Sequence, residues 1–191
     1  MFESAEIGHV VDKVQYQQRE PLLRKALLDA QYELAEARKF PVLLVIGGVD
    51  GAGKGETVNL LNEWMDPRHI QTNALPPPSD EERERPPMWR FWRELPPKGR
   101  IGIFFGSWYT DPIIRRTYGE LGRSAYEARL AEIVRFERML ADEGTLILKF
   151  WFHLSKQQQR ARLRELEKRS ETRWRVTETD SKHFALYHRF R

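Results

Sequence analysis

The chain has 191 residues, 40% of them hydrophobic and 12% aromatic, which excludes a disordered protein and is enough for one domain with a core. It contains no cysteine, which excludes disulfides and thiolate catalysis and favours a cytoplasmic location. No apolar run approaches the roughly 20 residues of a membrane span, so we expect no membrane partner. The net charge of +4, with arginine more frequent than lysine, leaves nucleotides, polyphosphate and nucleic acid open as partners.

Helical and extended patterns alternate along the chain. Residues 1–17 show little periodicity and are interpreted as an N-terminal arm, followed by one domain over 18–191. Apolar residues from Glu20 to Ala37 recur at helical spacing, with Pro21 in the first turn of the expected helix. The other expected elements are strands at Val42–Ile46, His69–Ala74, Ile101–Phe105 and Thr145–Phe152, a loop at 76–85, and helices ending near Met65, at 86–93, at Ala125–Leu140 and at Ser155–Arg169.

The predicted strands are apolar on both faces and are separated by helices. This pattern is typical of a parallel sheet covered by helices on both sides, which is a three-layer α/β sandwich. Ligands of such folds bind at the carboxyl ends of the strands. Three segments are expected there: the turn after Ile46, residues 105–109 and residues 153–156.

A glycine-rich segment, Gly-Val-Asp-Gly-Ala-Gly-Lys-Gly-Glu-Thr, directly follows the first predicted strand and opens a helix. Glycines let backbone N–H groups approach phosphate oxygens, and the helix N-terminus adds a partial positive charge. We therefore predict a P-loop in which Lys54 bridges phosphates and Asp50 contacts a metal ion or the acceptor; the alternative is a plain glycine turn with a surface lysine. The predicted phosphate-binding residues are Gly48, Gly51, Gly53, Lys54, Gly55, Glu56 and Thr57.

The P-loop differs from the usual pattern after its lysine. The pattern places a Ser or Thr there to hold Mg²⁺, whereas this chain has Gly55, and its nearest hydroxyl is Thr57. The neighbouring strand is also unusual, because phosphoryl transfer commonly uses a carboxylate near the metal and this strand ends in Phe105. A phenyl ring neither binds Mg²⁺ nor accepts a proton, so residues 104–109 are interpreted as core packing around an emptied site.

Two basic segments allow more than one interpretation. Arg160, Arg164 and Lys168 share one helix face, which is either a cationic lid over transferring phosphates or a solvated surface. The aromatic and basic run at 89–93 could stack on nucleic-acid bases, although buried aromatics with surface arginines are the more common arrangement. The histidines show no metal-ligand spacing, and we predict no role for them.

Several segments together resemble the polyphosphate kinase 2 family. They are Gly48–Gly55, Trp64–Arg68, Glu81–Trp92, Ser107–Tyr109, Phe136–Glu137 and Lys149–Trp151. The resemblance extends from about Glu20 to the last residue and implies a P-loop kinase-like fold with a helical lid. It also implies Mg²⁺-dependent phosphoryl transfer between inorganic polyphosphate and AMP or ADP. In that reaction Asp50, Lys54 and Arg116 would be catalytic, and Arg160, Arg164 and Lys168 would hold polyphosphate.

The chain departs from the family where active members read Asp-Arg-Ser-Trp-Tyr-Gly-Arg. Here Phe105 replaces the carboxylate, and Gly106 and Asp111 replace two arginines. In this respect the chain is similar to the first, degenerate domain of tandem-domain polyphosphate:AMP phosphotransferases. The resemblance thus implies a weak or inactive copy with a second domain in cis. Whether the chain is an enzyme stays open, because a non-catalytic polyphosphate- or nucleotide-binding partner of an active copy fits the same residues.

Members of this family normally continue through one more strand and helix than this chain. We therefore expect the C-terminal strand and helix to be missing and one sheet edge to be exposed, which would favour a homo-oligomer. Nucleic-acid binding ranks third, after the two polyphosphate hypotheses.

Overall fold

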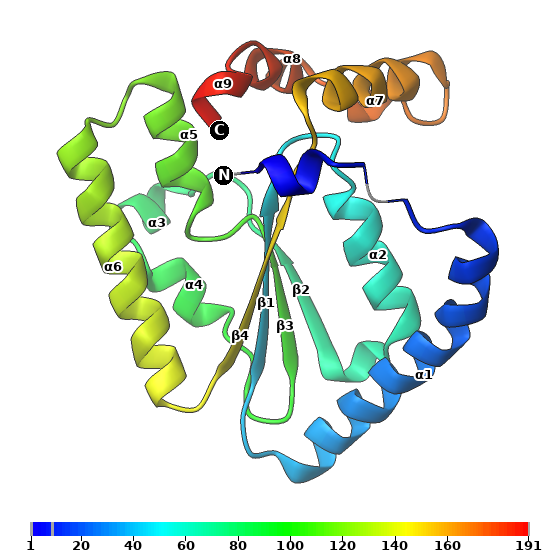
Figure 1. Cartoon of the computed structure of the whole chain (residues 1–191). Coiled ribbons are helices and arrows are strands. Elements are labelled where there is room, and N and C mark those ends of the chain that lie inside the picture. Colours follow the sequence, from blue (N-terminus) through cyan, green and yellow to red (C-terminus); the bar gives the residue numbers. More distant parts are fainter. Residues whose placement is uncertain (1, 9, 191) are drawn as a thin grey trace.

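Four parallel strands form the centre of the molecule, and helices cover both of their faces (Figure 1). The structure is a computed structural model that describes residues 2–8 and 10–190. The strands are β1 (Val42–Gly48), β2 (Ile70–Ala74), β3 (Ile101–Phe105) and β4 (Leu146–Phe152), in the order β2-β3-β1-β4. Val42 of β1 lies opposite Ile101 of β3 and Leu146 of β4, so the strands start level with one another. The predicted parallel α/β sheet is confirmed.

The helices lie on the two sides of the sheet and above the carboxyl ends of its strands (Figure 1). They are α1 (Lys13–Ala37), α2 (Lys54–Trp64), α3 (Asp80–Arg83), α4 (Trp89–Arg93), α5 (Thr110–Tyr118), α6 (Arg123–Asp142), α7 (Lys156–Lys168), α8 (Glu178–Ala185) and α9 (Tyr187–Phe190). Short 3₁₀ turns occur at Glu3–Glu6, Pro67–His69 and Arg173–Arg175. Helices α7, α8 and α9 form the layer above the strand ends, where we expected the ligand site.

Strand β1 divides the core into two clusters because its side chains alternate between the faces of the sheet. Leu43 and Val45 pack with residues of α4 and α6 on one face. Leu44 and Ile46 pack with residues of α1 and α2 on the other. Burying each such side chain contributes roughly 1.5–3 kcal/mol, so the two clusters fix β1 and the loop that follows it.

The aromatic and basic run of α4 belongs to the first of these clusters. Phe91 is buried and meets the ring of Trp108 edge-on at 5.5 Å. Arg93 lies over the ring of Trp89, with 4.9 Å between the guanidinium carbon and the ring centroid. Phe91 and Arg93 thus fit the interpretation of buried aromatics with surface arginines, whereas Trp92 is 47% exposed and the side chain of Arg90 only 11%.

The first helix begins earlier than the apolar pattern predicts. It starts at Lys13 because the carboxylate of Asp12 accepts hydrogen bonds from the backbone N–H groups of Val14 and Gln15. Pro21 lies inside this helix, so its predicted place in the first turn was wrong. Residues 13–20 are exposed or nearly so and lack apolar periodicity, so the sequence pattern gave no sign of the two additional turns.

Four helices were not predicted: α3, α5, α8 and α9. Helix α3 occupies part of the expected loop at 76–85, where Ser79 and Glu82 form a capping box at its start. Helix α5 follows β3 directly, and its apolar residues face the cavity described below. All other predicted strands and helices are present within a few residues of the expected bounds.

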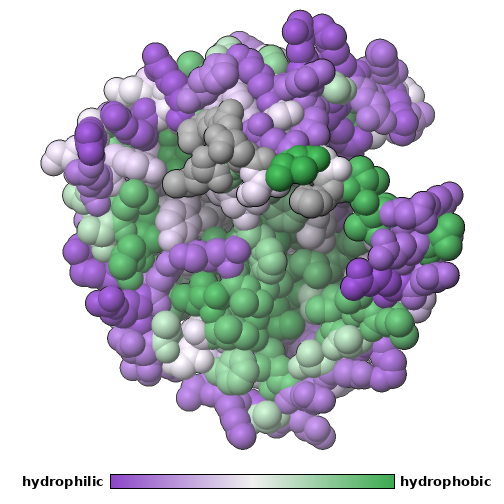
Figure 2. All heavy atoms as spheres, in the orientation of Figure 1, coloured by the Kyte–Doolittle hydropathy of each residue, from purple (hydrophilic) through white to green (hydrophobic). Residues whose placement is uncertain are grey.

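Strand β4 lies at the edge of the sheet and pairs with β1 on one side. Leu146, Leu148, Phe150 and Trp151 are all more than a third exposed. Figure 2 shows hydrophobic residues gathered at the centre of this face of the molecule. The predicted exposed sheet edge is thus present within the described residues, whereas the oligomer expected from it stays a prediction. None of the described helices combines the length and apolar character that a membrane crossing requires.

Candidate phosphate-binding site

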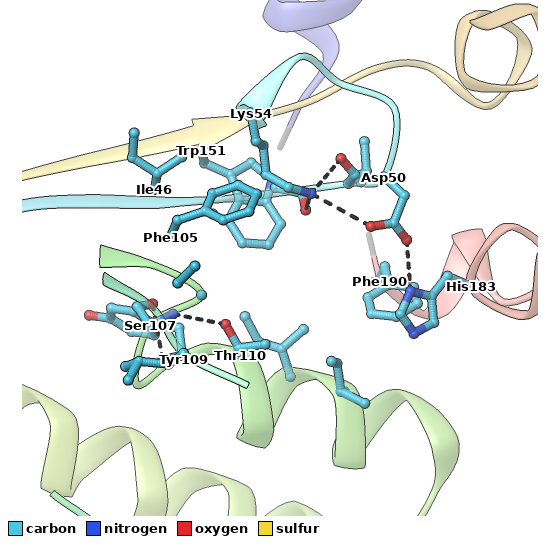
Figure 3. Close-up of a pocket in the computed structure, with 18 of the residues that line it drawn as sticks. Ile46, Asp50, Lys54, Phe105, Ser107, Tyr109, Thr110, Trp151, His183 and Phe190 are labelled. Atoms are coloured by element: carbon cyan, nitrogen blue, oxygen red, sulfur yellow. Dashed lines mark hydrogen bonds and ion pairs between the residues drawn. The ribbon is translucent and has the colours of Figure 1, made fainter. Parts of the chain in front are cut away.

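A cavity of about 480 Å³ lies at the carboxyl ends of β1 and β3 (Figure 3). Its wall is built from the loop after β1, the end of β3, helix α5 and the C-terminal helices α8 and α9. The fold therefore brings segments from residue 46 to residue 190 together at the edge of the sheet where we expected a ligand.

The loop after β1 contains three glycines with positive φ: Gly48, Gly51 and Gly53. Gly48 has a φ of 138°, and a Cβ atom at this position would lie 2.1 Å from the carbonyl oxygen of Phe152. The next residue, Val49, donates its backbone N–H to that same oxygen at 3.0 Å. Gly53 has a φ of 89° and immediately precedes α2. The chain thus leaves β1 against β4 and turns sharply into the helix, which places the N-terminus of α2 beside the cavity.

The side chain of Lys54 folds back onto this loop. Its Nζ atom donates hydrogen bonds to the carbonyl oxygens of Gly48 at 2.6 Å and Val49 at 2.8 Å, and it lies 3.6 Å from Oδ1 of Asp50. Burial lowers the pKa of Lys54, and the Asp50 carboxylate offsets only part of this effect. The lysine is therefore held in place on the cavity wall by two hydrogen bonds and an ion pair.

Asp50 has a second partner that the sequence analysis missed. Its Oδ2 atom lies 2.7 Å from Nδ1 of His183, a residue of α8 that is 133 positions further along the chain (Figure 3). Burial acts to raise the pKa of Asp50, but the hydrogen bond with His183 and the charge of Lys54 lower it overall. Local spacing carried no signal for this contact, because it depends on where the C-terminal helices pack.

Helix α7 presents a different face to the P-loop from the one the sequence analysis singled out. Gln159 is 2% exposed, and its Nε2 atom donates to the carbonyl oxygen of Asp50 at 2.9 Å. Glu56 pairs with Arg162 at 3.5 Å and with Arg175 at 3.0 Å. Residues three positions apart share a helix face, so Gln159 and Arg162 point the same way. The predicted lid residues are exposed and do not line the cavity: Arg160, Arg164 and Lys168.

The remaining predicted site residues are placed as follows. The hydroxyl of Thr57 donates to the carbonyl of Gly53 at 3.0 Å, so it is engaged within the helix. Gly55 has open space around it. Arg116 is exposed, lies outside the cavity lining and donates to the carbonyl of Leu121 at 3.1 Å. The roles predicted for these residues stay predictions.

The segment after β3 is anchored by a carboxylate on α6. Glu137 accepts hydrogen bonds from the hydroxyl of Tyr109 at 2.8 Å and from Nε1 of Trp108 at 3.1 Å, and it pairs with Lys149 at 2.8 Å. Trp108 is 2% exposed and belongs to the core, whereas Phe105 lines the cavity. Core packing therefore describes Phe104 and Trp108, whereas the other four residues of 104–109 line the cavity; that this site has been emptied stays a prediction.

The side chains around the cavity do not form a protein-held magnesium site. Mg²⁺ prefers an octahedron of oxygen ligands. Among the described residues that line the cavity, Asp50 supplies the one carboxylate, and it is engaged with Lys54 and His183. No group of three or more His, Cys, Asp or Glu side chains suited to a metal ion is found among the described residues. The donor set therefore does not fit an ion held by this chain alone.

Comparison with known proteins points to one family. Residues 10–191 match the family model described as Polyphosphate kinase 2 (PPK2). The chain is 54% identical over 190 residues to a polyphosphate:AMP phosphotransferase of Pseudomonas aeruginosa, covering 100% of this chain and 38% of that protein. It is 33% identical over 169 residues to an AMP/ADP-polyphosphate phosphotransferase of Meiothermus ruber, covering 88% of this chain and 63% of that protein.

Solved structures agree with this result. A crystal structure of polyphosphate kinase 2 from Pseudomonas aeruginosa matches with a TM-score of 0.88 and 52% identity, over 100% of this chain and 38% of that one. A structure from Arthrobacter aurescens matches with a TM-score of 0.90 and 29% identity, over 96% of this chain and 66% of that one. The chain thus spans well under half the length of its Pseudomonas aeruginosa relative.

Proposed function

Because the chain belongs to the polyphosphate kinase 2 family, we propose that its P-loop binds inorganic polyphosphate or the phosphates of AMP or ADP. The supporting observation is the loop itself: a buried strand, three glycines with positive φ, and Lys54 at the start of α2 beside a cavity. Backbone N–H groups and a lysine in this arrangement favour phosphate oxygens. A phosphate that engages Lys54 must compete with the carbonyl oxygens of Gly48 and Val49.

We further propose that phosphoryl transfer by this chain is weak. Transfer joins an acceptor phosphate oxygen to the terminal phosphorus of the donor and breaks its bond to the leaving phosphate. Charge develops on the phosphoryl oxygens, and fixed charged groups stabilise it, each commonly contributing roughly 10²–10³ in rate. Lys54 is one such group. Phe105, Gly106 and Asp111 supply no cation, and Phe105 lines the cavity as a phenyl ring. A metal ion needed for transfer would have to be coordinated mainly by the phosphates themselves.

A second candidate function is a non-catalytic module that binds polyphosphate or nucleotide beside an active copy of the domain. The observation that favours it is the coverage of the relatives, since this chain matches 38% of two polyphosphate:AMP phosphotransferases. A second polyphosphate kinase 2 domain in cis and a cytoplasmic setting belong to this proposal.

Turnover separates the two candidates. Polyphosphate, AMP and magnesium are incubated with the protein, and the ADP formed is measured by chromatography. For an enzyme, we expect slow ADP formation that Lys54→Ala abolishes and that the exposed control Lys25→Ala leaves unchanged. For a binding module, we expect no ADP above the Lys54→Ala background, although polyphosphate still binds. Partial recovery of transfer by Phe105→Asp combined with Gly106→Arg would identify a decayed active site.

A further inference from the structure

The N-terminal turn lies beside the end of β4 and close to α9 (Figure 1). Phe2 stacks on the ring of His153, with 4.5 Å between the centroids and 17° between the planes. Nε2 of His153 donates to Oε1 of Glu6 at 2.8 Å, and the histidine side chain is 3% exposed. The turn therefore contacts both the face and the edge of one buried ring.

The same ring is joined to helix α9. Tyr187, the first residue of α9, is 3% exposed, and its hydroxyl donates to the carbonyl oxygen of Leu154 at 2.9 Å. The hydroxyl oxygen also lies 3.4 Å from Nε2 of His153 and 3.5 Å from Oε1 of Glu6. Three segments that are far apart in the sequence thus meet at one hydrogen-bonded junction, formed by Glu6, His153 and Tyr187.

This junction lies next to the wall of the cavity. Tyr187 and Phe190 of α9 line the cavity, as does Trp151 of β4, whose ring is stacked 6.4 Å from that of Phe2. Helix α9 has four residues, and a helix of this length has little stability of its own. It also contacts α5, because the side chain of Arg189 donates to a backbone carbonyl of that helix at 3.2 Å. The position of α9 therefore depends on contacts such as those at the junction.

The turn itself is only lightly buried. Its residues at positions 4, 5, 7 and 8 are exposed, and Ile7 is 70% exposed. Phe2 and Glu6 are half-buried, and they carry the contacts described above. Segments with few buried contacts open at a free energy well below that of global unfolding. The turn can therefore be released while the core stays folded.

From the junction, its place beside the cavity wall and the exposure of the rest of the turn, we propose that residues 2–8 are a strap that holds α9 against the cavity and can be released. While the strap is in place, Tyr187 and Phe190 stay on the cavity wall. When the bond between Glu6 and His153 breaks, α9 moves away from the wall and widens the entrance. The strap controls access to the cavity whatever ligand enters it, so this inference does not depend on phosphate binding.

Amide hydrogen exchange tests whether the strap holds α9. Glu6→Ala should raise the exchange rate of the Arg189 amide, which donates to the carbonyl of Leu186 at 2.7 Å, about ten- to hundredfold, because a hydrogen bond to a charged group is lost. Glu6→Gln keeps a neutral acceptor and should give a smaller rise. Ile7→Ala is the matched control, since that exposed side chain lies in the same segment. Exchange at Val45 in β1 reports global unfolding and should not change.

Thiol labelling measures access to the cavity. The chain contains no cysteine, so Phe190→Cys introduces a single thiol on the cavity wall. The rate at which this thiol reacts with a maleimide reports how often α9 leaves the wall. In this background we expect Glu6→Ala to raise the labelling rate about ten- to hundredfold and Ile7→Ala to leave it unchanged.

Three results would overturn the proposal. The first is unchanged exchange at Arg189 and unchanged thiol labelling in Glu6→Ala. The second is an equally large rise at Val45, because the variant would then lose global stability instead of releasing a strap. The third needs no variant: strong protection of Arg189 without protection of the Ala5 amide, which donates to the carbonyl of Phe2 at 3.0 Å, would show that α9 is held without the turn. Polyphosphate titrated into a separate sample tests phosphate binding, so the two proposals can fail independently.

Discussion

Gly48 lies where β1 leaves the sheet, and its substitution tests whether the P-loop geometry depends on glycine. An added Cβ would lie 2.1 Å from the carbonyl oxygen of Phe152, 2.6 Å from its nitrogen and 2.8 Å from its carbonyl carbon, all backbone atoms of β4. Flexible side chains can move aside, but a paired strand cannot do so without losing hydrogen bonds. Gly48 also has a φ of 138°, a region that L-residues avoid.

The magnitude of the effect follows from these contacts. Strained backbone in a sparsely populated region costs of order 1–3 kcal/mol. Relief of the clash moves β1 from β4 and weakens the bond from Val49 N–H to the oxygen of Phe152, which contributes about 0.5–1.5 kcal/mol. We therefore expect Gly48→Ala to lower the free energy of unfolding by about 2–4 kcal/mol. This is a large part of the 5–15 kcal/mol typical of a domain.

Gly55 supplies the matched control, because it lies seven positions away in the first turn of α2 with nothing within 4 Å of a built Cβ. Gly55→Ala should be neutral or stabilise the fold by up to about 1 kcal/mol, since alanine favours helix. Urea denaturation followed by circular dichroism measures both variants. Equal stability of Gly48→Ala and the unchanged protein would refute the reasoning, as would a loss in Gly55→Ala as large as that in Gly48→Ala.

Three further predictions concern the core, a helix end and pH. Leu43→Ala should lower the free energy of unfolding by about 2–5 kcal/mol because Leu43 is 0% exposed. Val134→Ala is the control: this side chain is 55% exposed, so the change should stay below about 0.5 kcal/mol. Denaturant unfolding of both variants measures the difference. Asp12→Ala should destabilise the fold by about 1 kcal/mol and increase amide hydrogen exchange at Val14 and Gln15, and unchanged exchange there would contradict the cap. The hydrogen bond to Glu137 raises the pKa of Lys149. Burial, and to a smaller extent the hydrogen bond to Glu137, raises the pKa of Tyr109. The stability that these two shifts contribute is complete below about pH 10 and is lost as the pH rises through the folded-state pKa values. Between pH 8 and pH 11 the melting temperature of Glu137→Gln should fall less steeply than that of the unchanged protein. Parallel curves for the two proteins would contradict the role given to Glu137.

Much of the fold was predictable because local patterns determine it. Strand β1 is an apolar run followed by glycines. Helix α2 begins directly after the glycine-rich turn, and α7 begins after its N-cap residue Ser155, so both starts could be predicted from local sequence. The start of α1 was not predictable from apolar spacing, since it depends on Asp12 and on side chains that remain exposed. Helix α5 was not predictable from local signals, because it is only nine residues long and no side-chain cap marks its start.

The candidate site was predictable only in its local part. The glycines and Lys54 follow one another in sequence, so the loop could be identified from spacing. The contact between Asp50 and His183 joins residues 133 positions apart and follows from the packing of α8 over the loop. Helix α7 has charged residues on nearly every side, so its inward face could not be chosen from charge. In the structure Gln159 and Arg162 point toward the loop. The predicted face, which contains Arg160, points away from it.

Calorimetric titration of long-chain polyphosphate, with magnesium present, tests phosphate binding at the P-loop most directly. We expect saturable binding that weakens about ten- to hundredfold in Lys54→Ala, because a charged hydrogen-bond donor contributes about 1.5–3 kcal/mol. Binding to Lys25→Ala should stay unchanged, since that side chain lies exposed on α1. Absence of binding to the unchanged protein, or equal affinity in Lys54→Ala, would contradict a phosphate site at this loop.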